Sequence, residues 1–276
     1  MEEIGTEVDW KDLAHNLRSA PDNQKAQVAI SVSSMFSGVP EAREWLANYL
    51  RSEDAQKIPT YGISFLLRTF ITNPSPEEIT LVADNFWKVD TPDLLPTASL
   101  IIEAGEGKLS EQEKIKLAEK AREIFDNTKQ NPEHDNFGGK LIVIAGKFAP
   151  QIHEEWILEE LDNYPIPPVY TTQTIQAAVE FGIKFSPEKL VNKLMDILKR
   201  TSPGNVVRKT WLIGDLSNVL EIIKPDDLKL LSQSLGEIVK LPPKTIENCF
   251  AFKPQLVTRL TQKFPEEMKK ILHKLP

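Results

Sequence analysis

Apolar residues recur along most of the chain at the spacing of an α-helix. Near the start, the positions i, i+3, i+4 and i+7 are occupied by Trp10, Leu13, Ala14 and Leu17. The same spacing returns within residues 190–198 and 228–239, and near the other end at Met268, Ile271, Leu272 and Leu275. Because this spacing places apolar side chains on one side of a helix, each segment is predicted to be a helix with one buried face. Strand-like alternation is scarce, so the predicted fold class is all-α.

Capping residues mark several of the predicted helix starts. Ser75 and Ser110 are each followed three residues later by a glutamate. In such a capping box the serine oxygen accepts a hydrogen bond from a first-turn amide, and the glutamate accepts one from the serine amide. The sequence Ser186-Pro187-Glu188 adds proline at the first helical position, where its missing N–H costs nothing. Ser186 is therefore predicted to cap its helix as well.

The predicted helix starts are nearly periodic. They fall at Pro40, Pro76, Glu111, Pro150, Pro187, Pro225 and Pro265, at separations of 36, 35, 39, 37, 38 and 40 residues. A more apolar helix precedes each start, for example over residues 63–71, 141–148 and 175–185. A two-helix unit of about 35–45 residues is typical of helical solenoids. The period predicts an α-solenoid of about six to seven stacked helix pairs, each of which buries its apolar face against the next.

In this period and pattern, the chain resembles the HEAT-like family of α-solenoids over most of its length. The resemblance implies a superhelix of helix pairs. Two family features, an aspartate in the turn within each unit and a basic residue at a fixed place in the second helix, do not recur consistently here. Pro242-Pro243 and Pro254 also divide the last unit into shorter pieces. An irregular helical domain is the alternative that fits the same pattern.

Charge is distributed unevenly along the 276 residues. The net charge of −7 argues against a basic nucleic-acid binder as a whole. A proline-rich break at residues 164–170 separates two predicted groups of repeats: an acidic N-terminal group over residues 1–162, with a net charge of −13, and a basic C-terminal group over residues 163–276, with a net charge of +6. Both could belong to one continuous solenoid. Residues 131–139 are polar and are predicted to form a loop.

The cellular location is predicted from the absence of a signal-peptide pattern and of a membrane-spanning segment. The acidic start has no signal-peptide pattern, and no stretch approaches the roughly 18 apolar residues of a membrane-spanning helix. The single cysteine, Cys249, permits no intrachain disulfide. We therefore expect a cytoplasmic protein that does not insert into a membrane.

No pattern predicts a catalytic, cofactor or metal site. Gly138-Gly139-Lys140 lacks the first glycine and the Ser/Thr of a phosphate-binding loop. Asp12 and His15 offer two ligands on one helical turn, which is too few for a metal site. Cys249 lies in an apolar segment and is expected to pack as a small hydrophobe. The remaining histidines are expected on the surface: His134, His153 and His273. We expect no enzymatic activity and no cofactor.

A row of basic residues is the predicted partner-binding surface. Lys189, Lys193 and Arg200 follow one side of a helix whose other side is apolar, and Lys229 extends the row into the next unit. Equivalent positions of stacked repeats lie about 10 Å apart. Such a row would meet an acidic peptide, a phosphate backbone or the protein's own acidic half. A solvated helix surface is the alternative.

An acidic stripe precedes that row in the sequence. Glu155, Glu159 and Asp162 lie at i, i+4 and i+7, beside Glu154 and Glu160. The stripe would either dock a basic partner or form a solvated outer face.

The predicted function is that of a non-enzymatic binding or scaffolding protein with a protein or peptide partner, because a stack of helix pairs offers a long binding surface. The first alternative is nucleic-acid binding or processing through the basic C-terminal half. The second is an accessory subunit of a modifying enzyme. Fold alone does not decide among them.

Overall fold

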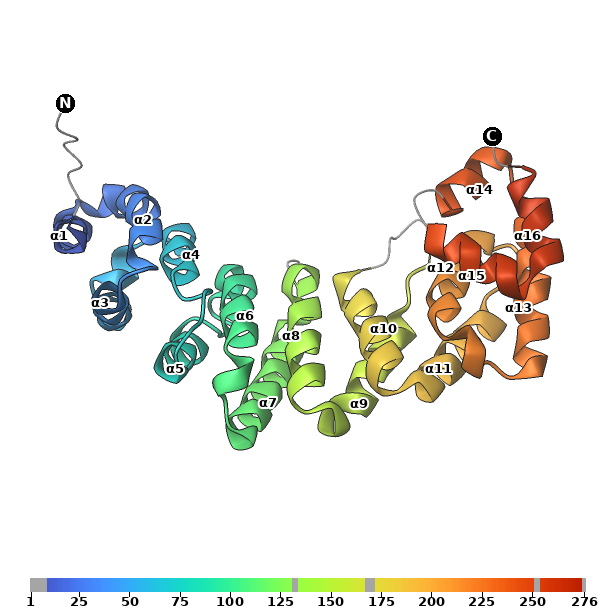
Figure 1. Cartoon of the computed structure of the whole chain (residues 1–276), viewed down its shortest axis with the longest axis horizontal. Coiled ribbons are helices and arrows are strands. Elements are labelled where there is room, and N and C mark those ends of the chain that lie inside the picture. The colour runs from blue at the N-terminus through green and yellow to red at the C-terminus, as the bar shows by residue number, and fades with distance from the viewer. Residues whose placement is uncertain (1–8, 131–133, 167–171, 251–253, 275–276) are drawn as a thin grey trace, which may run out of the picture. The chain divides into compact units, whose positions relative to one another are not determined.

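The computed structural model describes residues 9–130, 134–166, 172–250 and 254–274 (Figure 1). Over these ranges the chain forms sixteen α-helices and five short 3-10 helices, and no strand. The predicted all-α class is therefore confirmed. Within the same ranges, no helix has the length and apolar character needed to cross a membrane.

The chain divides into two compact units, residues 1–149 and 150–276. The α-helices of the first unit are α1 (Trp10–Ser19), α2 (Asp22–Phe36), α3 (Pro40–Leu50), α4 (Thr60–Arg68), α5 (Pro76–Asn85), α6 (Leu95–Ala104), α7 (Glu111–Thr128) and α8 (His134–Phe148). Those of the second are α9 (Pro150–Glu159), α10 (Gln173–Phe185), α11 (Pro187–Arg200), α12 (Val206–Leu216), α13 (Pro225–Ile238), α14 (Pro243–Phe250), α15 (Pro254–Lys263) and α16 (Pro265–Leu272). The 3-10 helices are η1 (Ala55–Lys57), η2 (Pro92–Leu94), η3 (Glu106–Lys108), η4 (Glu160–Asn163) and η5 (Ser217–Ile222).

All seven predicted helix starts are the first residues of helices, namely of α3, α5, α7, α9, α11, α13 and α16. The predicted loop over residues 131–139 is wrong from His134 onward, where α8 begins; residues 131–133 lie outside the described part. Phe137 in this helix is 2 % exposed, and α8 packs along α7. Burying a phenylalanine stabilises by roughly 2 kcal/mol, which offsets the cost of about 1 kcal/mol for each glycine in a helix.

In the first unit, α2 and α4 pack side by side and run in the same direction. Near their N-terminal ends, a side chain at Gly62 would meet the Cα of Ala26 at 3.0 Å. Near their C-terminal ends, the hydroxyl of Thr69 donates to the carbonyl of Ser33 at 3.0 Å. The glycine therefore permits a close approach of the two backbones.

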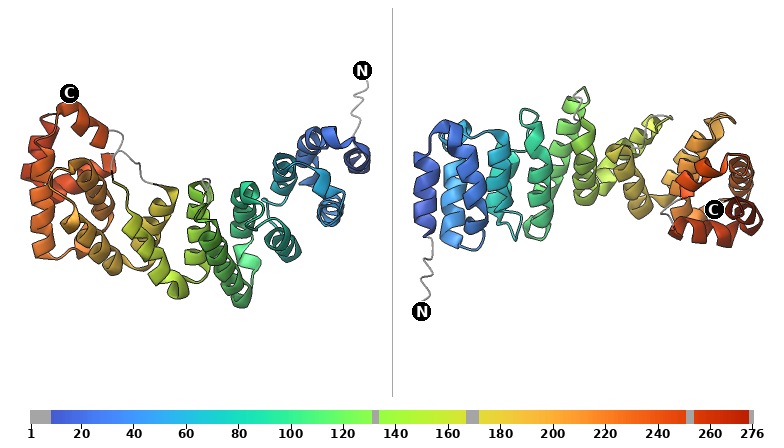
Figure 2. Two further views of the ribbon diagram at one scale, coloured as in Figure 1. Left: turned by 180° about the vertical axis from the view of Figure 1, so that it is seen from behind. Right: turned by 90° about the horizontal axis from the view of Figure 1, so that it is seen from above.

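This packing continues along the first unit. Ser64 and Thr97 share a hydrogen bond of 3.0 Å between α4 and α6, and α6 packs in turn against α8. The helices α2, α4, α6 and α8 thus form one row, which Figure 2 shows as neighbouring helices from blue to green. We call α3, α5 and α7 the other row. Within it, Lys120 of α7 donates to the carbonyl of Ala83 in α5.

Several hydrogen bonds between successive repeats join residues about one repeat apart, in agreement with the period of the sequence. Separations of 33 to 37 residues occur in both units: Ser33–Thr69, Arg43–Glu78, Ser64–Thr97, Asn73–Lys108, Ala83–Lys120, Glu154–Lys189 and Ser232–Glu267.

The second unit begins with α9, which packs against α10 and α11. Between α9 and α10, Tyr164 is anchored: its hydroxyl donates to Asp215 at 2.6 Å, and Arg208 donates to its carbonyl at 2.8 Å. Burial, followed by the nearby charge of Asp215, raises the pKa of Tyr164 well above its usual value. The predicted proline-rich break therefore starts at a fixed residue, while residues 167–171 lie outside the described part.

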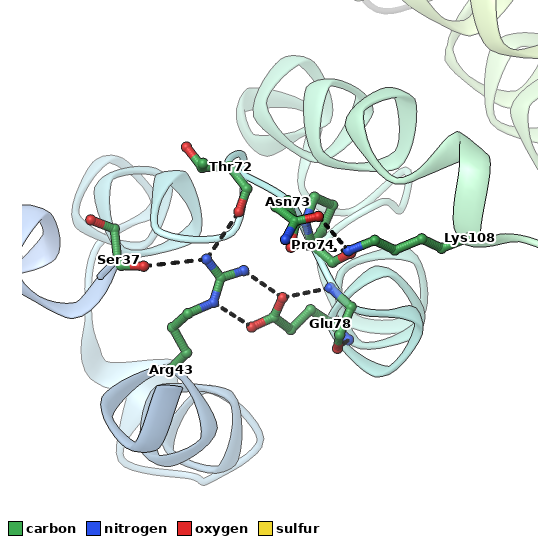
Figure 3. A network of polar contacts seen from close by, with 8 residues as sticks. Ser37, Arg43, Thr72, Asn73, Pro74, Glu78 and Lys108 are labelled. Atoms are coloured by element: carbon green, nitrogen blue, oxygen red, sulfur yellow. Dashed lines mark hydrogen bonds and ion pairs between the residues drawn. The ribbon is translucent and has the colours of Figure 1, made fainter. Parts of the chain in front are cut away.

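Figure 3 shows how one helix pair is joined to the next. Arg43 of α3 donates from Nε to Glu78 Oε1 at 2.9 Å and from Nη2 to Oε2 at 2.6 Å, and its Nη1 donates to the carbonyl of Thr72 at 3.0 Å. Glu78 belongs to the predicted capping box of α5, since it also accepts from the amide of Ser75. Both charged side chains are largely buried, at 15 % and 10 % exposed.

The turn between α4 and α5, whose Thr72 carbonyl binds Arg43, is also bound by Lys108. Lys108 donates to Asn73 Oδ1 at 2.6 Å and to the carbonyl of Pro74 at 2.7 Å (Figure 3). Asn73 has a φ of 53°, the left-handed region in which asparagine is one of the tolerated residues. Residues from two neighbouring repeats thus bind the turn between α4 and α5.

We expect Arg43→Met to lower the free energy of unfolding of the first unit by about 3 kcal/mol, because it leaves the buried carboxylate of Glu78 without its cation. Native-state hydrogen exchange of α3 and α5 measures the change. The control is Arg51→Met, which removes an exposed arginine whose hydrogen-bond partner among the described residues is Asn48, and it should change stability by less than about 0.5 kcal/mol. Equal effects of the two substitutions would contradict the role of the Arg43–Glu78 pair.

The capping box of Ser110 and Glu113 is present, but Ser186 makes no capping hydrogen bond. The prediction for Ser186 was wrong because its hydroxyl donates to Glu154 of α9 instead. Ser110→Ala is expected to lower the free energy of unfolding by about 1 kcal/mol through the lost cap. Gln112→Ala, an exposed change in the same turn, should alter the urea midpoint far less. Indistinguishable midpoints for the two variants would remove the cap assignment.

Candidate interaction surface

The predicted basic row faces the predicted acidic stripe. Lys189 of α11 pairs with Glu154 of α9, and Lys193 Nζ lies 2.7 Å from Asp162 Oδ2 in η4. Hydrogen bonds from Lys189 and then Ser186 hold the pKa of Glu154 below its usual range. The sequence left three binding partners open for the row: an acidic peptide, a phosphate backbone or the protein's own acidic half. In the structure, Lys189 and Lys193 contact the protein's own acidic segment in α9 and η4.

The other two predicted residues also have carboxylate partners. Arg200 lies 2.8 Å from Asp196 on its own helix, and Lys229 lies 2.9 Å from Asp226 on its own helix. The link from α11 to α13 is made instead by Lys199, whose Nζ is 2.9 Å from Asp227. A partner-binding role of Lys189, Lys193, Arg200 and Lys229 stays a prediction, but binding there would compete with ion pairs inside the unit.

The charge asymmetry depends on where the chain is divided. The boundary predicted after residue 162 falls inside the second compact unit, so the acidic residues of α9 and η4 belong with the basic residues that they face. Residues 150–276 hold 17 basic and 16 acidic side chains, and residues 1–149 hold 16 basic and 24 acidic ones. The second unit is therefore nearly neutral, while the first is acidic.

An open polar groove of about 740 Å³ lies along α3 and α5, beside the network of Figure 3. It is lined by Ser37, Pro40, Arg43, Glu44, Ala47, Asn48, Arg51, Thr72, Asn73, Ser75, Glu77 and Glu78. Its central cation, Arg43, is already bound to Glu78 and two carbonyls. The groove offers hydrogen-bonding groups but no free charge at its centre.

The residues considered for chemistry are dispersed. His153 is buried at 2 % exposed and meets Trp156 edge to face, so the expectation of a surface position was wrong for this histidine. The side chains of His134 and Cys249 lie outside the described part, and Gly138-Gly139-Lys140 lies inside α8. Across the described residues, no three His, Cys, Asp or Glu side chains are grouped to hold a metal ion.

The five tryptophans are all buried or partly buried. The large apolar side chains that do reach the surface of the first unit include Met35 of α2, Tyr61 of α4 and Leu100 of α6, which are 49 %, 57 % and 41 % exposed. These three residues lie on successive helices of one row. Sequence reasoning missed them because it treated the apolar residues of these helices as buried.

The two rows of the first unit differ sharply in charge. The helices α2, α4 and α6 together contain four charged residues: Asp22, Lys25, Arg68 and Glu103. The helices α3, α5 and α7, of similar total length, contain fifteen. Lys25 is buried, and its Nζ binds carbonyls of α1 and Asp54. We call the exposed side of α2, α4 and α6 the charge-poor face.

The charge-poor face is the candidate interaction surface because it combines exposed apolar and aromatic side chains with a scarcity of charge. Its signal in the sequence is the low charge of residues 22–36, 60–68 and 95–104. No protein-family model matches this chain, and no curated protein and no solved structure matches it either.

Proposed function

We propose that this protein is a non-enzymatic helical-repeat scaffold that binds a protein or peptide partner on its charge-poor face. In this proposal the helix pairs stack as an α-solenoid of the HEAT-like kind. The periodic helix starts, the row α2–α4–α6–α8 and the hydrogen bonds at one-repeat separation support that arrangement. Stacked repeats of this kind create extended surfaces that suit macromolecular partners.

The observation that carries the proposal is the contrast between the two rows of the first unit. Exposed residues of α3, α5 and α7 are largely charged, as expected for a solvated surface. The charge-poor face instead exposes Met35, Tyr61 and Leu100. Protein interfaces are enriched in aromatic residues, Met and Arg at their centres and depleted in Lys, Glu and Asp. The composition of the charge-poor face matches that pattern.

Nucleic-acid binding has less support from the structure than from the sequence. Its argument was the basic C-terminal half, and the second unit is nearly neutral when α9 and η4 are included. Lys189 and Lys193 are moreover paired with carboxylates. A phosphate backbone would have to displace these carboxylates, which repel it.

Affinity capture from native cells with the full chain tests the proposal. The face variant carries Met35→Glu, Tyr61→Glu and Leu100→Glu, which place charges on exposed positions. The control variant carries Glu44→Lys and Glu119→Lys on the opposite row, where both residues are exposed. We expect a stoichiometric partner with wild type and control, and on the order of tenfold less of it with the face variant.

Circular dichroism and the urea midpoint should show that both variants are folded. If the face variant still captures the partner but the control variant does not, the partner binds the row of α3, α5 and α7 instead. Turnover of a small molecule by the pure protein would contradict the non-enzymatic proposal.

A further inference from the structure

The charge-poor face contains a cation without a carboxylate partner. The guanidinium carbon of Arg68 lies 4.6 Å from the ring centroid of Phe65, one turn earlier on α4, and Arg68 is exposed. Among the described residues, the Arg68 side chain forms no ion pair and no hydrogen bond, whereas Arg43 and Arg200 each face a carboxylate. Stacking on an aromatic ring holds a guanidinium in place while leaving its N–H groups free to donate.

Apolar residues of the neighbouring helices flank this cation. The hydrogen bond between Ser64 and Thr97 fixes the level of α4 against α6. One turn further along these parallel helices, Arg68 on α4 and the exposed Leu100 on α6 lie at the same level.

The opposite flank is formed by α2. The close approach of Gly62 to Ala26 fixes the level of α4 against α2. One turn further along, Phe65 on α4 is level with Ile30 on α2, and both are partly exposed. We call Ile30, Phe65, Arg68 and Leu100 the α2–α6 band.

The charge around the band favours an acidic partner. Arg68 is the only charged residue of α4, and the carboxylate of Glu103 on α6 is 3.9 Å from Lys140 of α8. An approaching carboxylate thus meets one stacked guanidinium flanked by the apolar side chains of Ile30 and Leu100. Guanidinium and carboxylate groups form paired, charge-assisted hydrogen bonds in that geometry, which strengthen as water is excluded.

The hydrogen-bonding groups beside the band favour an extended peptide over a folded helix. Asn23, Gln24 and Gln27 are exposed on α2 and provide amides that donate and accept. An extended peptide needs such groups, because its backbone amides and carbonyls are not paired internally, whereas a helix has already paired them.

Helix spacing then sets the periodicity of the peptide. Packed helices lie about 8–10 Å apart, and three residues of polyproline-type chain advance about 9 Å with side chains returning to the same side. A peptide crossing α2, α4 and α6 would therefore present every third side chain to the band.

We propose that the α2–α6 band binds an extended peptide that carries two apolar side chains six residues apart and, midway between them, an Asp or Glu opposite Arg68. The inference rests on the proposed function and names the class of partner. Arg68 and Phe65 fix the position of the peptide, and Ile30 and Leu100 contact its apolar side chains.

Selection from a displayed library of random peptides of about twelve residues, with the full chain as bait, tests this inference. We expect wild type to enrich apolar residues at i and i+6 with Asp or Glu at i+3. In Arg68→Glu, the same position should enrich Lys or Arg, and a wild-type-selected synthetic peptide should bind on the order of 30-fold more weakly. Lys116→Glu on α7, also exposed, is the matched control and should keep both the consensus and the affinity.

Three outcomes would overturn the inference. Selected peptides with apolar residues at i, i+3, i+4 and i+7 would indicate a helical partner, and equal binding by wild type and Arg68→Glu would exclude the acidic contact. If no peptide is enriched while the face variant still loses its captured partner, the inferred peptide class is wrong and the proposed function is retained. Tyr61→Ala, an exposed variant two turns before Arg68 on α4, should weaken binding of the synthetic peptide without changing the urea midpoint.

Discussion

Short helices must bury their apolar faces against neighbouring helices, and the rest of this structure depends on that constraint. The sixteen helices are between 8 and 18 residues long. Isolated helices shorter than about 12–15 residues are marginal in water, so packing supplies most of their stability. In the first unit the packing runs along α2, α4, α6 and α8, where Gly62 allows two backbones to approach closely.

Cationic side chains donate hydrogen bonds to carbonyl groups at the C-terminal ends of several helices. None of the described glycines has a positive φ, so these helices end without the usual glycine cap. Carbonyls at or beyond the ends of helices receive hydrogen bonds from a neighbouring helix instead, as with Lys25 on Arg18, Arg43 on Thr72 and Lys120 on Ala83. A cation also complements the negative end of the helix dipole. The C-terminal ends of α1, α4 and α5 are therefore stabilised by cations from neighbouring segments.

Local chemistry explains which predictions from the sequence succeeded. Proline at the first helical position and the boxes of Ser75 and Ser110 act within one turn, and they located helix starts to the residue. The hydroxyl of Ser186 and the ring of His153 depend on what packs against them, which the local pattern does not contain. The charge-poor face was missed for the same reason, because periodicity reveals a helical face but not whether another helix covers it.

The one-repeat separation of these polar links determines which insertions and deletions the chain tolerates. A bond such as Arg43–Glu78 or Ser33–Thr69 reaches only the adjacent pair of helices. A duplicated pair would bring its own donors and acceptors and could meet its neighbours as the original pair does. Gain or loss of a whole pair is therefore tolerated more readily than gain or loss of part of one, since a partial change shifts every donor away from its acceptor.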